Sequence, residues 1–216
     1  MTSLSASGST EPVVHLVEDD ASTRDATARF LRASGYTVNA YTNAEEFLSA
    51  SLPDALGCIV LDLRLPGANG LELQKTLAER EHSLPIVFLT GHGDVADSVR
   101  AMKSGAVDFL TKTVDGSDLL EAIRQALARG EEQREARLRR RASRERYDRL
   151  TPREREVFAH LISGQLNKQV GFDLGISERT IKIHRHQVLE KMEADSIADL
   201  VRMAADLGIT PVGKVR

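Results

Sequence analysis

Five short apolar runs alternate with amphipathic segments in the first 129 residues, and this alternation constrains the fold more than any other feature of the chain. The apolar runs predict strands at Val13–Val17, Thr37–Tyr41, Cys58–Leu61, Ile86–Leu89 and Val107–Leu110. The segments that follow them predict helices at Ser22–Ser34, Ala44–Ser51, Gly70–Arg80, Val95–Ser104 and Asp118–Arg129. Five strand–helix repeats of this kind are typical of a doubly wound parallel sheet that is covered by helices on both faces.

Four of the expected strands end at side chains that carry chemistry. Val13–Val17 stops at Glu18-Asp19-Asp20, the third strand at Asp62, the fourth at Thr90, and the fifth just before Lys112. Ligands of a parallel α/β sheet bind at the carboxyl ends of its strands. We therefore expect these side chains to converge on a single pocket.

This pocket has the chemistry for a metal ion and a phosphoryl group. Clustered carboxylates without cysteine or histidine ligands favour a hard ion such as Mg²⁺, which would screen the repulsion between Asp62 and an incoming phosphoryl group. The Thr90 hydroxyl would donate a hydrogen bond to a phosphoryl oxygen, and Lys112 would neutralise the remaining charge. Because phosphoryl transfer depends mainly on positioning and charge stabilisation, the sequence predicts Asp62 as the phosphoryl acceptor.

A nucleotide-binding pocket is the alternative for such a sheet. A Rossmann or P-loop domain places glycines after its first strand, where backbone N–H groups cradle phosphate. The corresponding turn here, Glu18–Ser22, has three acids and no glycine. It would repel a bare phosphate and attract a cation, which argues against a dinucleotide site.

The charge of the chain is unevenly distributed. Residues 1–125 carry 10 Lys and Arg against 18 Asp and Glu, a net charge of −8, and residues 126–216 carry 19 against 14, a net charge of +5. An acidic half joined to a basic half indicates two domains with different partners. A basic C-terminal half is compatible with DNA as one of those partners.

The segment 130–149 is rich in Glu, Arg, Gln and Ala, and we interpret it as a charged helical linker. Glu135 and Arg139, and likewise Arg141 and Glu145, lie four residues apart and would support a solvated helix. Its large apolar residues are too sparse for a coiled-coil seam. Whether this helix is continuous with the one before it stays open at this point.

From Leu150 onward the pattern is purely helical. Thr151–Glu154 reads as a capping box with proline at the first helical position. Further helices are expected at Asn167–Leu174, Glu178–Met192 and Ile197–Leu207. The second and third of the four are joined by a short turn at Gly175, which resembles a helix-turn-helix.

The helix Glu178–Met192 is the expected recognition helix. On a helical wheel Ile181, Val188 and Met192 share the face that would pack on the core. Recognition helices place their N-terminal residues on base edges, so the expected base contacts come from Arg179, Lys182, Ile183 and His186. The residues better placed for phosphate contacts, which position without specifying sequence, are Lys168, Thr180 and Arg185.

These patterns together resemble a two-component response regulator of the NarL/FixJ subfamily, in which a receiver domain precedes a LuxR-type helix-turn-helix. The resemblance covers roughly residues 12–208. The matching motifs are Leu16–Asp20, Asp62–Pro66 with Gly70, Leu89–Gly91, Gly105–Lys112, Leu150–Val157, Asn167–Gln169, Leu174–Lys182 and His184-Arg185. It implies a flavodoxin-like, five-stranded receiver followed by an all-α domain of four helices.

The resemblance also implies how the acids act. Asp62 would accept phosphate from a histidine kinase in a step that the receiver partly catalyses itself, and the chain would not otherwise be an enzyme. Asp19 and Asp62 would ligate Mg²⁺, Glu18 would assist through water, and the Arg64 backbone carbonyl would complete the protein ligands. Arg64 and His92, two residues after Asp62 and Thr90, would tune the lifetime of the phosphorylated state.

The remaining implications concern signalling. Thr90 and Phe109 would form the switch pair that reports phosphorylation to the outer face, with Lys112 on the phosphoryl group. The partners would be a histidine kinase, double-stranded DNA and, when phosphorylated, a second copy of the chain. Cys58, the single cysteine, is expected to be a buried thiol, and no apolar run approaches the ~18 residues of a membrane span. A cytoplasmic protein without membrane attachment is therefore expected.

The expected domain boundaries follow from these segments. They are a disordered tail at 1–11, the receiver at 12–129, the linker at 130–149, the DNA-binding domain at 150–210 and a second tail at 211–216.

Two positions depart from the family pattern. The family usually has proline after the conserved lysine, and Thr113 follows Lys112 here. A non-proline residue strongly favours a trans peptide bond, so Lys112 would either reach Asp62 along a different path or require a strained loop. Gly171 replaces the usual small helix former and should cost its helix ~1 kcal/mol.

Two other functions are weighed against the regulator. The receiver could be a protein-docking module that is never phosphorylated, with DNA binding independent of phosphorylation. Thr113 favours this reading, and the intact acid cluster opposes it. A phosphatase-type hydrolase with an aspartate nucleophile would need a second acid two residues after Asp62, where Arg64 stands.

Overall fold

The computed structural model describes residues 12–50, 56–67, 69–79, 84–91 and 94–213. They divide into a unit before Arg134 and a unit from Arg134 onward. The tail expected at 1–11 lies outside the described residues, as do residues 214–216 of the second tail. None of the helices in the described ranges is long and apolar enough to cross a membrane.

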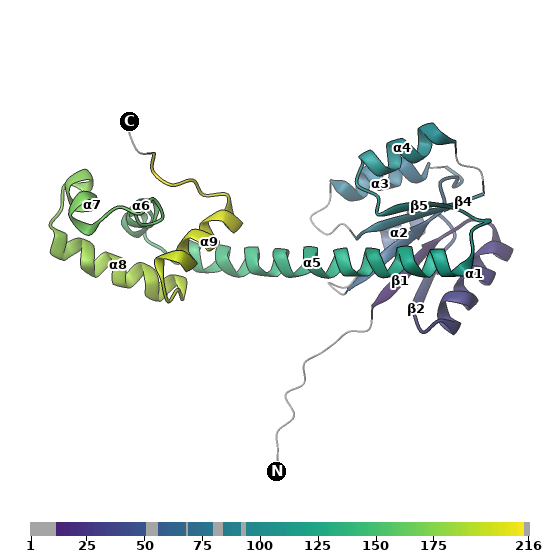
Figure 1. The fold of residues 1–216 in the computed structure, drawn as a ribbon, viewed down its shortest axis with the longest axis horizontal. Helices are drawn as coiled ribbons and strands as arrows, with labels where there is room; N and C mark the ends of the chain where they lie inside the picture. Colours follow the sequence, from purple (N-terminus) through teal and green to yellow (C-terminus); the bar gives the residue numbers. More distant parts are fainter. Residues whose placement is uncertain (1–11, 51–55, 68, 80–83, 92–93, 214–216) are drawn as a thin grey trace, which may run out of the picture. The chain divides into compact units, whose positions relative to one another are not determined.

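The first unit is built on a parallel sheet with the order β2-β1-β3-β4-β5 (Figure 1). This is the order of flavodoxin-like doubly wound sheets, and the predicted fold class is confirmed. The elements are β1 Val13–Val17, α1 Ala21–Ala33, β2 Thr37–Tyr41, α2 Ala44–Ser49, β3 Gly57–Leu61, α3 Gly70–Ala78, β4 Ile86–Thr90, α4 Val95–Lys103, β5 Asp108–Thr111 and α5 Gly116–Asp148.

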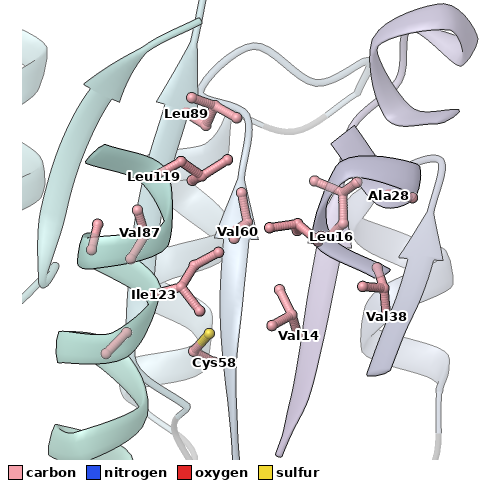
Figure 2. Close-up of a cluster of buried hydrophobic side chains, with 13 residues drawn as sticks. Val14, Leu16, Ala28, Val38, Cys58, Val60, Val87, Leu89, Leu119 and Ile123 are labelled. Carbon is pink, nitrogen blue, oxygen red and sulfur yellow. The ribbon is translucent and has the colours of Figure 1, made fainter. Parts of the chain in front are cut away.

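Alternate strand residues supply the two faces of the sheet, and each face has its own hydrophobic core. One core packs strand residues against α1 and α5; Figure 2 shows its side chains, among them Val14, Leu16, Cys58, Val60, Val87, Leu119 and Ile123. The other core packs strand residues against α2, α3 and α4; it includes Val17, Ile59, Leu61, Phe88, Phe47, Leu73 and Ala101. Cys58 is fully buried, as predicted, and burial raises the pKa of its thiol to about 12.

Helix α5, Gly116–Asp148, answers a question that the sequence left open. The expected helix Asp118–Arg129 and most of the expected linker form one continuous helix through Asp148. Gly130 lies inside this helix although glycine is a poor helix former. A Cβ at this position would lie 3.1 Å from the carbonyl oxygen of Gly57 and 3.4 Å from Pro85. Close packing of the helix on the sheet therefore explains why a glycine stands within it.

The second unit contains four helices after α5, as expected, at α6 Pro152–Leu161, α7 Asn167–Leu174, α8 Glu178–Met192 and α9 Ile197–Leu207. Both hydrogen bonds of the capping box between Thr151 and Glu154 are present. The core includes Val157, Phe158, Leu161, Val170, Ile181, Val188, Met192 and Leu200.

The turn between α7 and α8 is tight. Gly175 ends α7 with φ +66°, a conformation that glycine adopts readily. A Cβ on Gly171 would lie 2.8 Å from the carbonyl oxygen of Ile176. Gly171 therefore lets the turn approach α7 closely. This role stands beside the cost in helix stability that the sequence predicts.

Candidate phosphorylation site and DNA-binding surface

Three acids meet at the carboxyl ends of β1 and β3. Glu18 and Asp19 follow β1, Asp62 follows β3, and one carboxylate oxygen of each lies within 4.8 Å of the others. Glu18 and Asp62 are buried, whereas Asp19 is exposed. Burial, followed by the nearby charge of Asp62, raises the pKa of the Glu18 carboxyl.

Lys112 closes the acid cluster from the end of β5. Its Nζ lies 2.7 Å from Glu18 Oε2 and 2.7 Å from Asp62 Oδ2. Burial opposes the charged ammonium group, but the hydrogen bonds to Asp62 and Glu18 outweigh burial and raise the pKa of Lys112. One ammonium group among three carboxylates leaves an excess of negative charge, which an oxygen-seeking divalent cation such as Mg²⁺ would balance. The donor set therefore fits this ion.

Lys112 reaches Asp62 although Thr113 stands where proline is usual. No cis peptide bond occurs in the described ranges, so the Lys112–Thr113 bond is trans. Among the described non-glycine residues only Glu193 has a positive φ, and the loop is therefore free of left-handed backbone strain. The Lys112 backbone N–H donates to the Thr90 carbonyl at 2.8 Å, and the hydroxyls of Thr111 and Thr113 lie 2.9 Å apart. Of the two options for the Lys112–Thr113 loop, the structure supports a different path of Lys112 to Asp62 and not a strained loop.

Thr90 and Phe109 lie on neighbouring strands near the acids. Thr90 is buried at the end of β4, and Phe109 is half-buried in β5, where it is in register with Phe88. The ring centroids of Phe88 and Phe109 are 5.8 Å apart. This arrangement puts both members of the expected switch pair on adjacent strands.

The loop after Asp62 is held by backbone contacts. The Arg64 N–H donates to Asp62 Oδ1 at 3.2 Å, and Arg64 forms an isolated β-bridge with Asn69. A Cβ on Gly70 would lie 2.5 Å from the Asp62 carbonyl oxygen, so the first residue of α3 must be a glycine for this loop to close. His92, the other residue expected to tune phosphate lifetime, lies outside the described residues.

Sequence reasoning missed Arg24, a half-buried residue of α1. Its Nη1 donates to the carbonyl oxygens of Glu18 at 2.9 Å and Asp19 at 3.0 Å. The only sequence signal for this contact is an arginine placed one turn into the helix that follows the acid pair.

The expected recognition helix, α8, carries all of the predicted DNA contacts except Lys168, which lies in α7. Ile181, Val188 and Met192 are fully buried, as the wheel predicts. The predicted DNA-contact residues are exposed or half-buried: Lys168, Arg179, Thr180, Lys182, Ile183, Arg185 and His186. Three of them have side-chain partners within the protein. Lys182 lies 3.3 Å from Glu178, Arg185 donates to Asn167 Oδ1 at 3.3 Å, and the Thr180 hydroxyl lies 2.8 Å from that of Ser177.

Comparison with known protein families separates the same two parts. Residues 14–124 match the response regulator receiver domain, and residues 148–204 match the family described as bacterial regulatory proteins, luxR family.

Individual relatives match over nearly the whole chain. Nodulation protein W of Bradyrhizobium diazoefficiens is 44% identical over 94% of this chain and 89% of that protein. The transcriptional regulatory protein FixJ of Azorhizobium caulinodans is 43% identical over 92% of this chain and 94% of that protein. Among solved structures, the response regulator StyR matches with a TM-score of 0.77 and 41% identity, over 91% of this chain and 99% of that one.

Proposed function

We propose that Asp62 is the phosphoryl acceptor of this chain and that a histidine kinase is the donor. The premise is that the chain belongs to the response regulators that join a receiver domain to a LuxR-type DNA-binding domain. The chain is a DNA-binding transcriptional regulator activated by phosphorylation, and it is not a classical enzyme. The observation that carries the proposal for Asp62 is its position, where it is buried beside Lys112 and within reach of two further acids.

The transfer itself would be a displacement at phosphorus. An oxygen of Asp62 attacks the phosphoryl group of a phosphohistidine, the P–N bond breaks, and the imidazole leaves as a neutral ring that retains or takes up one proton. Mg²⁺, held by Asp19, Asp62 and the Arg64 carbonyl with Glu18 acting through water, would supply positive charge to the transferred oxygens. Lys112 would exchange its contact with Asp62 for one with a phosphoryl oxygen and keep its contact with Glu18. We also propose that the receiver partly catalyses its own phosphorylation through these residues.

The signal would then pass to the neighbouring strands. The Thr90 hydroxyl donates to a phosphoryl oxygen, and Phe109 changes its packing in response. Support comes from the burial of Thr90 and from the adjacent positions of β4 and β5. The proposal also includes a phosphorylated homodimer, a cytoplasmic location and paired DNA half-sites, which α7 and α8 contact through the residues predicted from the sequence.

Intact mass spectrometry tests the acceptor. The full-length chain is incubated with Mg²⁺ and acetyl phosphate, which is a small phosphodonor that needs no kinase. The wild type should gain the mass of one phosphoryl group, and Asp62→Asn should gain none. An equal gain in both would show that Asp62 is not the acceptor.

The phosphorylation-independent reading makes the opposite prediction in the same experiment. A receiver that serves only as a docking module would gain no mass in the wild type. Its main support was Thr113, and that support is weakened by the 2.7 Å contact between Lys112 and Asp62.

A further inference from the structure

Arg24 donates hydrogen bonds to the backbone carbonyl oxygens of the acidic loop Glu18-Asp19-Asp20. Its side chain donates to the carbonyl oxygens of Glu18 and Asp19 at 2.9 and 3.0 Å, and its backbone N–H donates to the Asp20 carbonyl at 2.9 Å. All three carbonyl oxygens of Glu18-Asp19-Asp20 are therefore held by a single residue.

The other contacts of this loop hold different groups. The Glu18 N–H donates to the Tyr41 carbonyl at 3.1 Å, and the Asp20 carboxylate accepts from the Thr23 N–H at 2.7 Å as the N-cap of α1. These contacts fix the two ends of the loop. On either side of Asp19, whose carboxylate is exposed, the Arg24 guanidinium holds the peptide carbonyl oxygens, and the Asp20 N–H donates to Glu18 Oε1 at 3.3 Å.

We propose that Arg24 is a positioning residue for the cation site, an inference that rests on the proposed function. Mg²⁺ requires near-ideal octahedral geometry at short distances, so a loop that supplies two of its acids must hold their backbone in one orientation. A guanidinium group suits this task because its donors have a fixed planar geometry. Residues that orient metal ligands typically change metal affinity by about 10–100-fold when removed.

The direction in which Mg²⁺ affinity changes when Arg24 is removed distinguishes a positioning role from a purely electrostatic one. Arg24 brings a positive charge close to the site, and that charge alone opposes a divalent cation. If charge were its only influence, removing Arg24 would strengthen Mg²⁺ binding. If Arg24 positions the loop, removing it weakens Mg²⁺ binding in spite of the relieved repulsion.

Helix α1 also supplies a matched control. Arg32 donates to the Val38 carbonyl at 3.0 Å, so Arg32→Gln removes the same charge and a similar contact with a backbone carbonyl. This contact is made to β2 and does not involve the acidic loop. Its loss should therefore leave Mg²⁺ binding unchanged.

The test is a Mg²⁺ titration of the full chain without any phosphodonor. Binding is measured from the shifts of the amide NMR signals of the acidic loop. Arg24→Gln should weaken Mg²⁺ binding about tenfold, and Arg24→Lys, which keeps the charge and a flexible donor, should weaken it less. Unchanged or tighter binding in Arg24→Gln would overturn the proposal. If Arg24→Gln does not fold, Arg24→Lys decides on the same criterion, because it must bind more weakly than both the wild type and Arg32→Gln.

Phosphorylation by acetyl phosphate gives a second readout. The rate for Arg24→Gln should return to the wild-type value at saturating Mg²⁺, and a rate that stays low would contradict a role limited to the cation site. Failure of the proposed function looks different, because the wild type itself would then gain no phosphoryl group from acetyl phosphate, whatever its affinity for Mg²⁺.

Discussion

At the scale of single residues, Lys112 decides the electrostatic balance of the site. Its side chain is 23% exposed, and its ammonium group bridges two carboxylates that are almost fully buried. Removing one partner of such a group leaves buried charge without compensation, which costs more than the interaction itself contributes.

Lys112→Met should therefore destabilise the receiver by about 2 kcal/mol when Mg²⁺ is absent. If Mg²⁺ binds the folded acid cluster as proposed, it should restore more stability to the variant than it adds to the wild type, because in the variant it replaces the missing positive charge. Urea denaturation with and without Mg²⁺ measures both effects. Lys103→Met, which removes an exposed lysine at the end of α4, is the control. Equal Mg²⁺ effects in Lys112→Met and the wild type would contradict this account.

At the scale of elements, α8 is fixed to α6 by an ion pair between the half-exposed Lys191 and the buried Glu154. Lys191 Nζ lies 2.8 and 2.7 Å from the two carboxylate oxygens of Glu154, which is only 3% exposed and also accepts from the Thr151 N–H. Burial opposes the charged carboxylate, but the hydrogen bonds from Lys191 and Thr151 outweigh burial and lower the pKa of Glu154.

Lys191→Met should therefore destabilise the DNA-binding unit by about 2 kcal/mol, because it leaves the Glu154 carboxylate buried without its cation. Lys182→Met is the matched control on the same helix. Its pair with Glu178 is 3.3 Å long and well exposed, and it should contribute only about 0.3–0.5 kcal/mol. Hydrogen exchange of α6 and α8 amides measures both changes, and equal losses would contradict the predicted importance of burial.

The same pair gives the DNA-binding unit a pH dependence. Since the folded pKa of Glu154 is depressed, its contribution to stability is fully present above the unfolded value of about 4.3 and is lost as pH falls through the folded pKa. The difference in stability between wild type and Lys191→Met should therefore shrink in acid.

The elements also show what the sequence could predict. Strands β1 and β2 and helices α7, α8 and α9 have the predicted bounds, because apolar periodicity and capping residues are local signals. The acid cluster was predictable because parallel topology alone brings the ends of β1 and β3 together. The contacts of Arg24 and Lys191 were not, because they depend on how a long side chain folds back on a backbone or on a residue 37 positions away. The continuity of α5 with the linker stayed open in the sequence because the packing around Gly130 is a tertiary effect.

At the scale of the whole molecule, charge limits how phosphorylation can act. Residues 1–125 already carry a net charge of −8, and a phosphoryl group adds further negative charge. Direct electrostatic attraction of this half to DNA therefore cannot account for activation. The proposed pairing of two phosphorylated chains on two half-sites is compatible with this charge. Pairing would raise affinity through effective concentration and so depend on the presence of both half-sites.

The most direct test of the central claim is the affinity of the full chain for a duplex recovered by binding selection from random DNA. Fluorescence anisotropy is recorded at one fixed salt concentration, because affinity for DNA depends strongly on salt. Incubation with Mg²⁺ and acetyl phosphate should tighten binding by the wild type about tenfold, within the usual range of coupling between two sites, and leave Asp62→Asn unchanged. The same affinity before and after treatment of the wild type, or an equal gain in Asp62→Asn, would contradict the claim that a phosphoryl group on Asp62 controls DNA binding.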